Sequence, residues 1–145
     1  MAKFYIVATP IGNMGDITFR AIETLKSVDL ILCEDTRETK KILQRYNINT
    51  PTLSFHTQSK LAKVDKIFEL LKEGKNLALV SDAGTPTISD PGAVLVSQIK
   101  EHPDLRHGVD VIPIPGPSAV ISALSASGLP THEFTFLGFL PHKKG

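Results

Sequence analysis

Residues 76–92 read NLALVSDAGTPTISDPG, and this stretch decides the fold. Residues 77–80 are a short apolar run, which predicts a strand buried on both faces, as in a parallel sheet. A loop of small and polar residues follows, and residues 93–99 are predicted to form a helix. Strand-to-helix loops usually need only about 2 to 6 residues. Because this loop is longer, we expect it to bind a ligand at the carboxyl end of the sheet.

The residue types of this loop fit a binding role. Gly84 has no Cβ, so the backbone there can approach a ligand closely, while Pro86 and Pro91 limit the alternative shapes of the loop. A structural role is also expected at the end of the loop. There Ser89 or Asp90 would cap the following helix, with Pro91 at its first position.

Length and composition indicate one globular domain. The 145 residues are 41% hydrophobic, enough for a real core. Basic and acidic residues number 16 and 15, so the net charge of +1 gives no overall argument for nucleic-acid binding and leaves a local basic patch open. The single cysteine, Cys33, lies in an apolar run and is predicted to be a core residue, which suits a reducing cytosol. No apolar run approaches the ~20 residues that span a bilayer, and the amino terminus does not resemble a secretory signal. We therefore expect a cytoplasmic protein without membrane segments.

Further strands and helices are predicted from the spacing of apolar residues. Strands are expected at residues 4–8, 29–33, 52–55 and 109–114, and helices at residues 17–28, 36–46, 61–71 and 119–127. This alternation predicts the α/β class, with an open, mostly parallel five-stranded sheet flanked by helices. The small side chains of residues 119–127 favour close packing, or the close approach of a flat ligand, against that helix.

The loop after the first strand, TPIGNMGD at residues 9–16, contains two glycines and leads into a helix. This is where a nucleotide-binding domain places its phosphate-binding glycines. Neither G-x-G-x-x-G nor G-x-x-x-x-G-K-[ST] occurs here or elsewhere in the chain. A standard dinucleotide site or P-loop is therefore disfavoured.

Glu34, Asp35, Thr36 and Arg37 directly follow the second strand. Two carboxylates and a guanidinium at a strand's carboxyl end are well placed for a function. A structural role is equally possible, because Asp35 or Thr36 can cap the next helix and Arg37 can pair with a nearby acid.

The histidines give no comparable signal. His56 follows the third strand and is notable only for that position. His102 and His107 have no partners at metal-binding spacing, so no metal site is predicted.

Residues 134–140 form an aromatic, β-prone run near the carboxyl terminus. Little chain remains after it to cover its apolar surface. We expect this segment to drive self-association, by strand exchange or by edge pairing.

Five blocks in the same order resemble the ribosomal RNA small subunit methyltransferase I family, which belongs to the tetrapyrrole methylase (class III methyltransferase) superfamily. They are ATPIGNMGD (8–16), EDTRETKKIL (34–43), LVSDAGTPTISDPG (79–92), IPIPGPSA (112–119) and the ending SALSASGLP with FLGFLPHKKG (122–130 and 136–145). The third block is the most diagnostic. The resemblance extends from Phe4 to the last residue.

The resemblance implies a two-domain, homodimeric enzyme that transfers a methyl group from S-adenosylmethionine to the ribose 2'-oxygen of a cytidine in 16S rRNA. Family members are nearly twice as long, so this chain is similar to the amino-terminal domain alone. Residues 1–130 would form the cofactor-binding α/β domain, and residues 131–145 a linker or the first strand of a second domain. Since the second domain supplies part of the cofactor pocket, this chain alone would bind the cofactor weakly and be inactive.

The resemblance also implies which residues form the site. Those facing the cofactor would be Pro10, Gly12, Ser81, Asp82, Ala83, Gly84, Thr85, Pro86, Ser118 and Ala119. Loops of small residues can bind S-adenosylmethionine through backbone N–H and C=O groups, without a metal. For catalysis we predict Glu34 as the general base and Arg37 as a phosphate or carboxylate clamp. The other candidate bases are Asp35, Asp82, Asp90 and His56.

Two alternative functions stay open from the sequence. One keeps the fold and the cofactor but methylates a tetrapyrrole or another small substrate; ring methylases carry a G-x-G-P-G-D type of first loop, and TPIGNMGD favours RNA instead. The other is a non-catalytic binding or assembly module. Binding of S-adenosylmethionine in a calorimetric titration would favour the methyltransferases.

Overall fold

The computed structural model describes residues 1–56, 59, 61–90 and 92–141. The strands of this part are β1 (Ala2–Val7), β2 (Leu30–Cys33), β3 (Thr52–Ser54), β4 (Leu77–Val80) and β5 (Val109–Ile114). Its helices are α1 (Phe19–Ser27), α2 (Thr36–Arg45), α3 (Leu61–Lys72), α4 (Gly92–Glu101) and α5 (Ala119–Ala126), with a short 3-10 helix η1 (Met14–Asp16). Each predicted strand and helix is present, with ends shifted by one or two residues, and the α/β class is confirmed.

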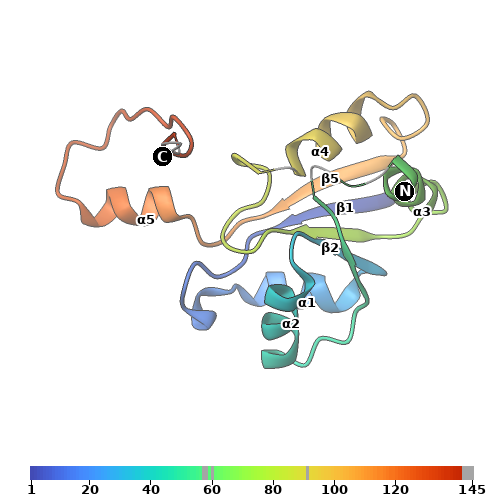
Figure 1. Cartoon of the computed structure of the whole chain (residues 1–145), viewed down its shortest axis with the longest axis horizontal. Coiled ribbons are helices and arrows are strands. Elements are labelled where there is room, and N and C mark those ends of the chain that lie inside the picture. The colour runs from blue at the N-terminus through green and yellow to red at the C-terminus, as the bar shows by residue number, and fades with distance from the viewer. Residues whose placement is uncertain (57–58, 60, 91, 142–145) are drawn as a thin grey trace.

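The strands form one open sheet in the order β3-β2-β4-β1-β5 (Figure 1). Every pairing between described strands is parallel. Phe4 of β1, for example, lies opposite Leu77 on one side and Val111 on the other. The prediction of a five-stranded parallel sheet is therefore confirmed.

The connections that follow the neighbouring parallel strands β1 and β4 run towards opposite edges of the sheet. The chain leaves β1 through α1 and reaches β2 on the far side of β4, whereas it leaves β4 through α4 and reaches β5 on the far side of β1. In Figure 1, α4 lies on the opposite side of the sheet from α1 and α2. The loops after β1 and β4 therefore diverge at a topological switch point, where ligands bind in open α/β sheets.

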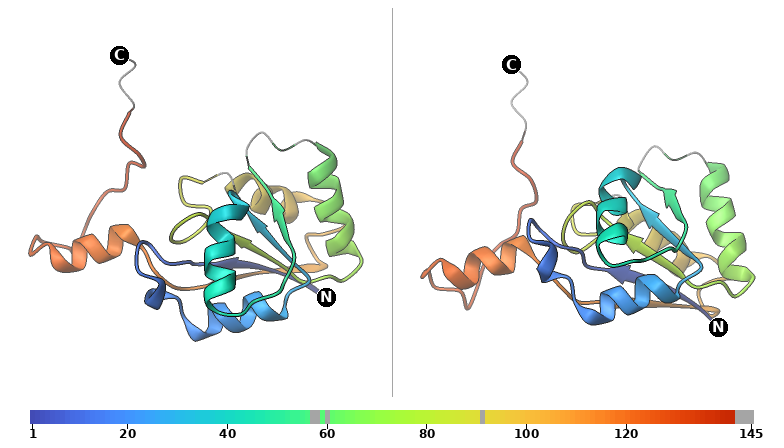
Figure 2. Two further views of the ribbon diagram at one scale, coloured as in Figure 1. Left: turned by 60° about the horizontal axis from the view of Figure 1, so that its bottom comes forward. Right: turned by 90° about the horizontal axis from the view of Figure 1, so that it is seen from below.

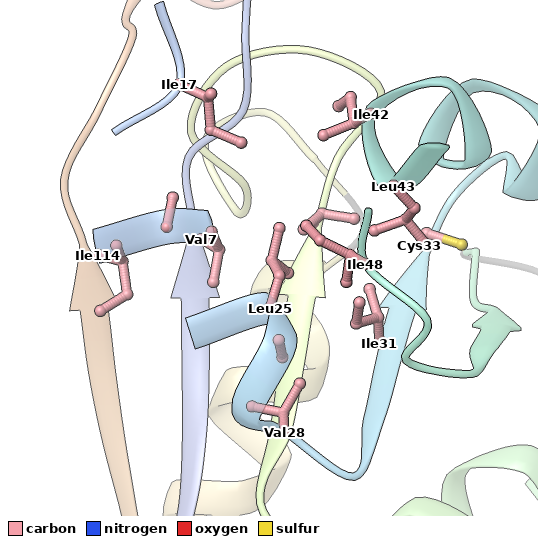
Figure 3. Packing of buried hydrophobic residues seen from close by; sticks show 13 residues of the cluster. Val7, Ile17, Leu25, Val28, Ile31, Cys33, Ile42, Leu43, Ile48 and Ile114 are labelled. Atoms are coloured by element: carbon pink, nitrogen blue, oxygen red, sulfur yellow. The ribbon is translucent and has the colours of Figure 1, made fainter. Parts of the chain in front are cut away.

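Strand β4 is buried on both faces, as the sequence predicts. Ala78 and Val80 join the cluster beneath α1 and α2, part of which Figure 3 shows. Leu77 and Leu79 join the opposite cluster, to which α3 and α4 contribute. Cys33 at the end of β2 is also a core residue, and burial raises the pKa of its thiol. Helices therefore cover both faces of the sheet and leave its carboxyl edge for the loops.

Helix caps fix where these loops end. The Thr18 hydroxyl accepts a hydrogen bond from Ala21 N at 3.0 Å at the start of α1. Asp90 Oδ1 accepts one from Gly92 N at 2.9 Å before α4, so of the two predicted cap residues it is Asp90 that acts. The prediction for Pro91 lies outside the described residues.

Helix α5 differs from the prediction of close packing. It has no buried residue, and in both views of Figure 2 it projects beyond the end of the sheet. Most of its residues are exposed and only Val120 and Leu124 are partly covered, so the predicted close packing is absent from the described chain. The following residues 133–141 contain no strand. In the described part of the chain, no helix combines the length and the apolarity that crossing a bilayer requires.

Candidate functional site at the carboxyl edge of the sheet

Hydrogen bonds join the loops that follow β1, β4 and β5. Thr9 N donates to the carbonyl of Gly84, and Gly84 N donates to the carbonyl of Thr9, each at 3.0 Å. The Thr9 hydroxyl donates to the Ser81 carbonyl at 3.3 Å, and the Thr85 hydroxyl donates to the Pro117 carbonyl at 3.2 Å. The three loops therefore form one unit, although they lie far apart in the sequence.

Gly84 is the residue on which this junction depends. Its φ is +75°, in the left-handed region that favours glycine. A Cβ at this position would lie 3.3 Å from Ile11 Cγ2 and 3.7 Å from the Pro117 carbonyl oxygen. The groups that lie against Gly84 belong to the neighbouring loops, so the glycine serves the junction between them, and the close approach of its backbone to a ligand stays a prediction.

Two hollows flank the residues just after β4. The first, of about 310 Å³, is called the Gly12 hollow and is lined by Pro10, Gly12, Met14, Glu38, Ile42 and Asp82. The second, of about 330 Å³, is called the Glu34 hollow and is lined by Glu34, Ser81, Asp82, Ile88, Asp90 and Phe139. Ala83 lines both hollows, as Asp82 does. These two residues therefore form a shared wall.

A larger hollow, of about 540 Å³, lies elsewhere, between the end of α2 and the start of β3. Its lining includes Lys40, Asn47 and Pro51 but no carboxylate or histidine. It is at the opposite end of β3 from the joined loops. Its size alone therefore does not make it a site for chemistry.

Glu34 lies beside other carboxylates in its hollow. Partial burial raises the pKa of Glu34, and the negative charges of Asp82 and Asp90 raise it further, while His56 lowers it. Asp82 is held in place because its Oδ1 accepts a hydrogen bond from Asp35 N at 3.1 Å. A carboxylate with a raised pKa is a stronger base than an ordinary glutamate, as general base catalysis requires.

Arg37 lines neither hollow. Its guanidinium is paired with Asp35 at 2.7 Å, and its side chain is 86% exposed. The hydrogen bonds from Arg37 lower the pKa of Asp35 to about 2. Asp35 also accepts a hydrogen bond from Arg37 N as the cap of α2. The structural interpretation of this pair is therefore confirmed, and the clamp role of Arg37 stays a prediction.

The predicted cofactor residues divide into three groups. Those that line a hollow are Pro10, Gly12, Ser81, Asp82, Ala83 and Thr85. Gly84 and Pro86 are buried inside the joined loops. Ser118 caps α5 by accepting a hydrogen bond from Ile121 N at 3.4 Å, and Ala119 is exposed beside it; neither lines a hollow.

Sequence analysis did not identify several residues of the hollows. Glu38 and Ile42 lie one turn apart on α2, so a helical projection starting from the Asp35 cap could have found them. Met14 is positioned by Tyr46, whose hydroxyl donates to the Met14 carbonyl. Phe139 lies in the run that the sequence predicts for self-association, and only the path of the chain after α5 brings it to the Glu34 hollow.

Residues 3–143 match the family model described as Tetrapyrrole (Corrin/Porphyrin) Methylases. The class of protein is thereby fixed, and the chain belongs to this methylase family. Solved structures share its fold: a putative cobalamin synthesis related protein (CobF) from Corynebacterium diphtheriae matches with a TM-score of 0.67 at 20% identity, over 92% of this chain and 60% of that one. The uroporphyrin-III-C-methyltransferase from Thermus thermophilus matches with a TM-score of 0.62 at 21% identity, over 88% of this chain and 53% of that one.

Sequence relatives are much more similar. The protein named Ribosomal RNA small subunit methyltransferase I in Vibrio cholerae is 55% identical, over 96% of this chain and 46% of its own length. The protein of that name in Bacillus subtilis is 54% identical, over 99% of this chain and 48% of its own length. The relative of that name in Thermotoga maritima is 51% identical over 99% of this chain and 63% of its own length. The chain thus spans about half the length of most of these relatives.

Proposed function

We propose that this chain is the amino-terminal, cofactor-binding part of an S-adenosylmethionine-dependent methyltransferase that modifies the ribose 2'-oxygen of a cytidine in 16S rRNA. The observation that carries the proposal is the pair of hollows at the switch point, which share the wall of Asp82 and Ala83. One hollow offers small residues and backbone, and the other offers a carboxylate with a raised pKa. The names of the relatives at 51–55% identity support rRNA as the substrate rather than a tetrapyrrole.

The Gly12 hollow fits part of a sulfonium methyl donor. An added Cβ at Gly12 would meet no atom within 4 Å, so there is open space beside the backbone. Pro10 and Ile42 provide apolar contacts, and Glu38 and Asp82 provide negative charge that attracts a cation. Its volume of about 310 Å³ is at the lower end for a small-molecule site, about 300–1,000 Å³, which is consistent with a pocket that other residues of the whole protein complete.

In methyl transfer the bond between the 2'-oxygen and the methyl carbon forms as the carbon–sulfur bond breaks, so donor and acceptor must meet directly where the two hollows adjoin, beside Asp82 and Ala83. S-adenosylmethionine supplies an electrophilic methyl group on its sulfur. The Glu34 carboxylate accepts the proton of the ribose 2'-hydroxyl, and S-adenosylhomocysteine is the leaving group. Holding the reacting groups in line supplies much of the rate acceleration, and a general base adds about 10²- to 10⁴-fold.

The test is methyl transfer to small ribosomal subunits by the full-length protein. Glu34→Gln is expected to lower kcat by about 10²- to 10⁴-fold while the Kd for S-adenosylmethionine stays the same. Glu23→Gln is the control, because Glu23 is an exposed residue of α1 outside both hollows. Unchanged turnover in Glu34→Gln would remove Glu34 from the mechanism, and an inactive wild-type protein would refute the proposed function.

A cytoplasmic homodimer is also part of the proposal. Helix α5 buries none of its residues, and Ile121, Leu129 and Leu140 are exposed on α5 and the segment after it. An exposed apolar surface of this kind favours association with a second copy. Light scattering should give the mass of a dimer, and a monomer at high concentration would contradict this part of the proposal.

A further inference from the structure

Phe139 lies in an unusual place for an aromatic residue. It lines the Glu34 hollow, yet its side chain is 83% exposed. A ring that stabilised the fold by packing would be buried, as Phe4 is in the core. Ile88 lines the same hollow and is also exposed. The rim of this hollow therefore offers apolar surface that the described chain leaves uncovered.

The backbone before Phe139 brings the ring to this position. The chain turns back after α5 (Figure 1), and Gly138 has a φ of +78°. A Cβ on Gly138 would lie 3.2 Å from Ser89 Oγ, so the backbone lies against the loop after β4. Glycine permits both the conformation and the approach. Phe139 thus reaches the hollow through a contact between the tail and the binding loop.

The acidic residues of the hollow have the opposite chemistry to its apolar residues. Glu34, Asp82 and Asp90 contribute carboxylates, which disfavour a phosphate group and accept hydrogen bonds from amino groups. At Asp90, Oδ1 accepts the hydrogen bond from Gly92 N. The occupant should therefore be flat and apolar on its faces, carry no negative charge where it meets the carboxylates, and have an amino group at its edge. A nucleobase with an exocyclic amino group has all these properties.

We infer that the Glu34 hollow receives the base of the acceptor nucleotide, with Phe139 stacking on one face and a carboxylate accepting from the amino group. The inference rests on the proposed function and names the part of the substrate that the hollow recognises. Stacking holds the nucleotide so that its ribose lies beside Glu34. Phe139 is therefore a substrate-binding residue, located outside the loops that the sequence singles out.

The first experiment measures KM and kcat for small ribosomal subunits with the full-length protein. Stacking of a base on an aromatic residue is worth about 1–3 kcal/mol, so Phe139→Ala should raise KM about 5- to 150-fold and leave the Kd for S-adenosylmethionine unchanged. Phe139→Tyr keeps the ring and should stay within about threefold of wild type. Leu137→Ala is the matched control, since Leu137 is 88% exposed in the same segment but lines no described hollow.

The outcomes separate this inference from the proposed function. An active wild type with an unchanged KM in Phe139→Ala would overturn the inference alone. Equal defects in Phe139→Ala and Leu137→Ala would also overturn it, because the segment would then be a general contact surface. A wild type that transfers no methyl group would overturn the proposed function and this inference with it.

A second measurement does not depend on turnover. The chain contains no tryptophan, so Phe139→Trp in this chain introduces a single indole at the rim of the hollow. Titration with cytidine should quench its fluorescence more strongly than titration with uridine, because uracil has no exocyclic amino group to donate. Leu137→Trp should respond equally to both nucleosides. Equal responses to both nucleosides in Phe139→Trp would overturn the assigned amino contact.

Discussion

Replacing Gly84 by alanine should weaken both the fold and cofactor binding. Gly84 has a φ of +75°, and an alanine in the left-handed conformation costs about 1–2 kcal/mol. The smaller entropy of the unfolded alanine chain offsets about 0.4–1 kcal/mol of this. The new Cβ would also lie 3.3 Å from Ile11 Cγ2, so Ile11 must shift. We expect the free energy of unfolding to fall by about 1 kcal/mol or slightly more.

The functional effect follows from the position of Ile11, which lines the Gly12 hollow. A shift of Ile11 changes the shape of that hollow and should raise the Kd for S-adenosylmethionine. Urea unfolding followed by circular dichroism measures the first effect, and calorimetric titration of the full-length protein measures the second.

Gly74→Ala is the matched control for this prediction. Gly74 follows α3 with a φ of +84°, and a Cβ there would meet nothing within 4 Å. Both variants should lose similar stability, because both place alanine in the left-handed region. Only Gly84→Ala should lose cofactor affinity. Equal affinities in the two variants would refute the reasoning that the junction of loops shapes the cofactor site.

Gly92→Ala should lower the free energy of unfolding by about 1–3 kcal/mol in urea titrations, because its Cβ would lie 2.5 Å from Leu79 Cδ2 in the core. Thr18→Ala removes the cap of α1 and should cost about 1 kcal/mol in the same assay, whereas Thr18→Ser should cost little. Arg37→Ala should raise the pKa of Asp35, measured by NMR titration, from about 2 towards its ordinary value near 3.9. Because the folded pKa of Asp35 is lowered, its stabilising contribution is present at neutral pH and is lost as the pH falls towards 2. The Arg37→Ala variant should show a smaller acid dependence, since the backbone hydrogen bonds to Asp35 remain.

The pH dependence of catalysis offers a test of Glu34. Burial and the charge of Asp82 raise the pKa of Glu34, so Asp82→Asn should lower that pKa. The acid limb of the pH–rate profile should then move to lower pH in the variant. A limb that stays in place would separate Glu34 from the proton transfer.

The fold was largely predictable because it depends on local patterns. The apolar run at residues 77–80 required burial on both faces, and helices with one apolar face supplied the cover. Helix α5 was the exception, since its small apolar residues indicated packing that the described chain does not provide. Composition shows that a surface can be buried but does not specify the partner that covers it.

The site was predictable only in part. The loops after β1 and β4 were identified from their length and glycines, and Glu34 from its place at a strand end. Residue type alone left Arg37 either as a clamp or as the partner of a nearby acid, and the structure shows it paired with Asp35 and outside both hollows. Side chains at the end of one strand can point towards the site or away from it, and a helix cap decides which.

By itself, the sequence determined the order of strands and helices, the burial of β4 and the position along the chain of the loops at the strand ends. These depend on residue type and spacing over short distances. Only the tertiary structure decided that Thr9 pairs with Gly84, that two hollows share the wall of Asp82 and Ala83, and that Phe139 reaches one of them. The crossover connections between the parallel strands bring these residues together, and no local sequence pattern predicts which strand ends become neighbours.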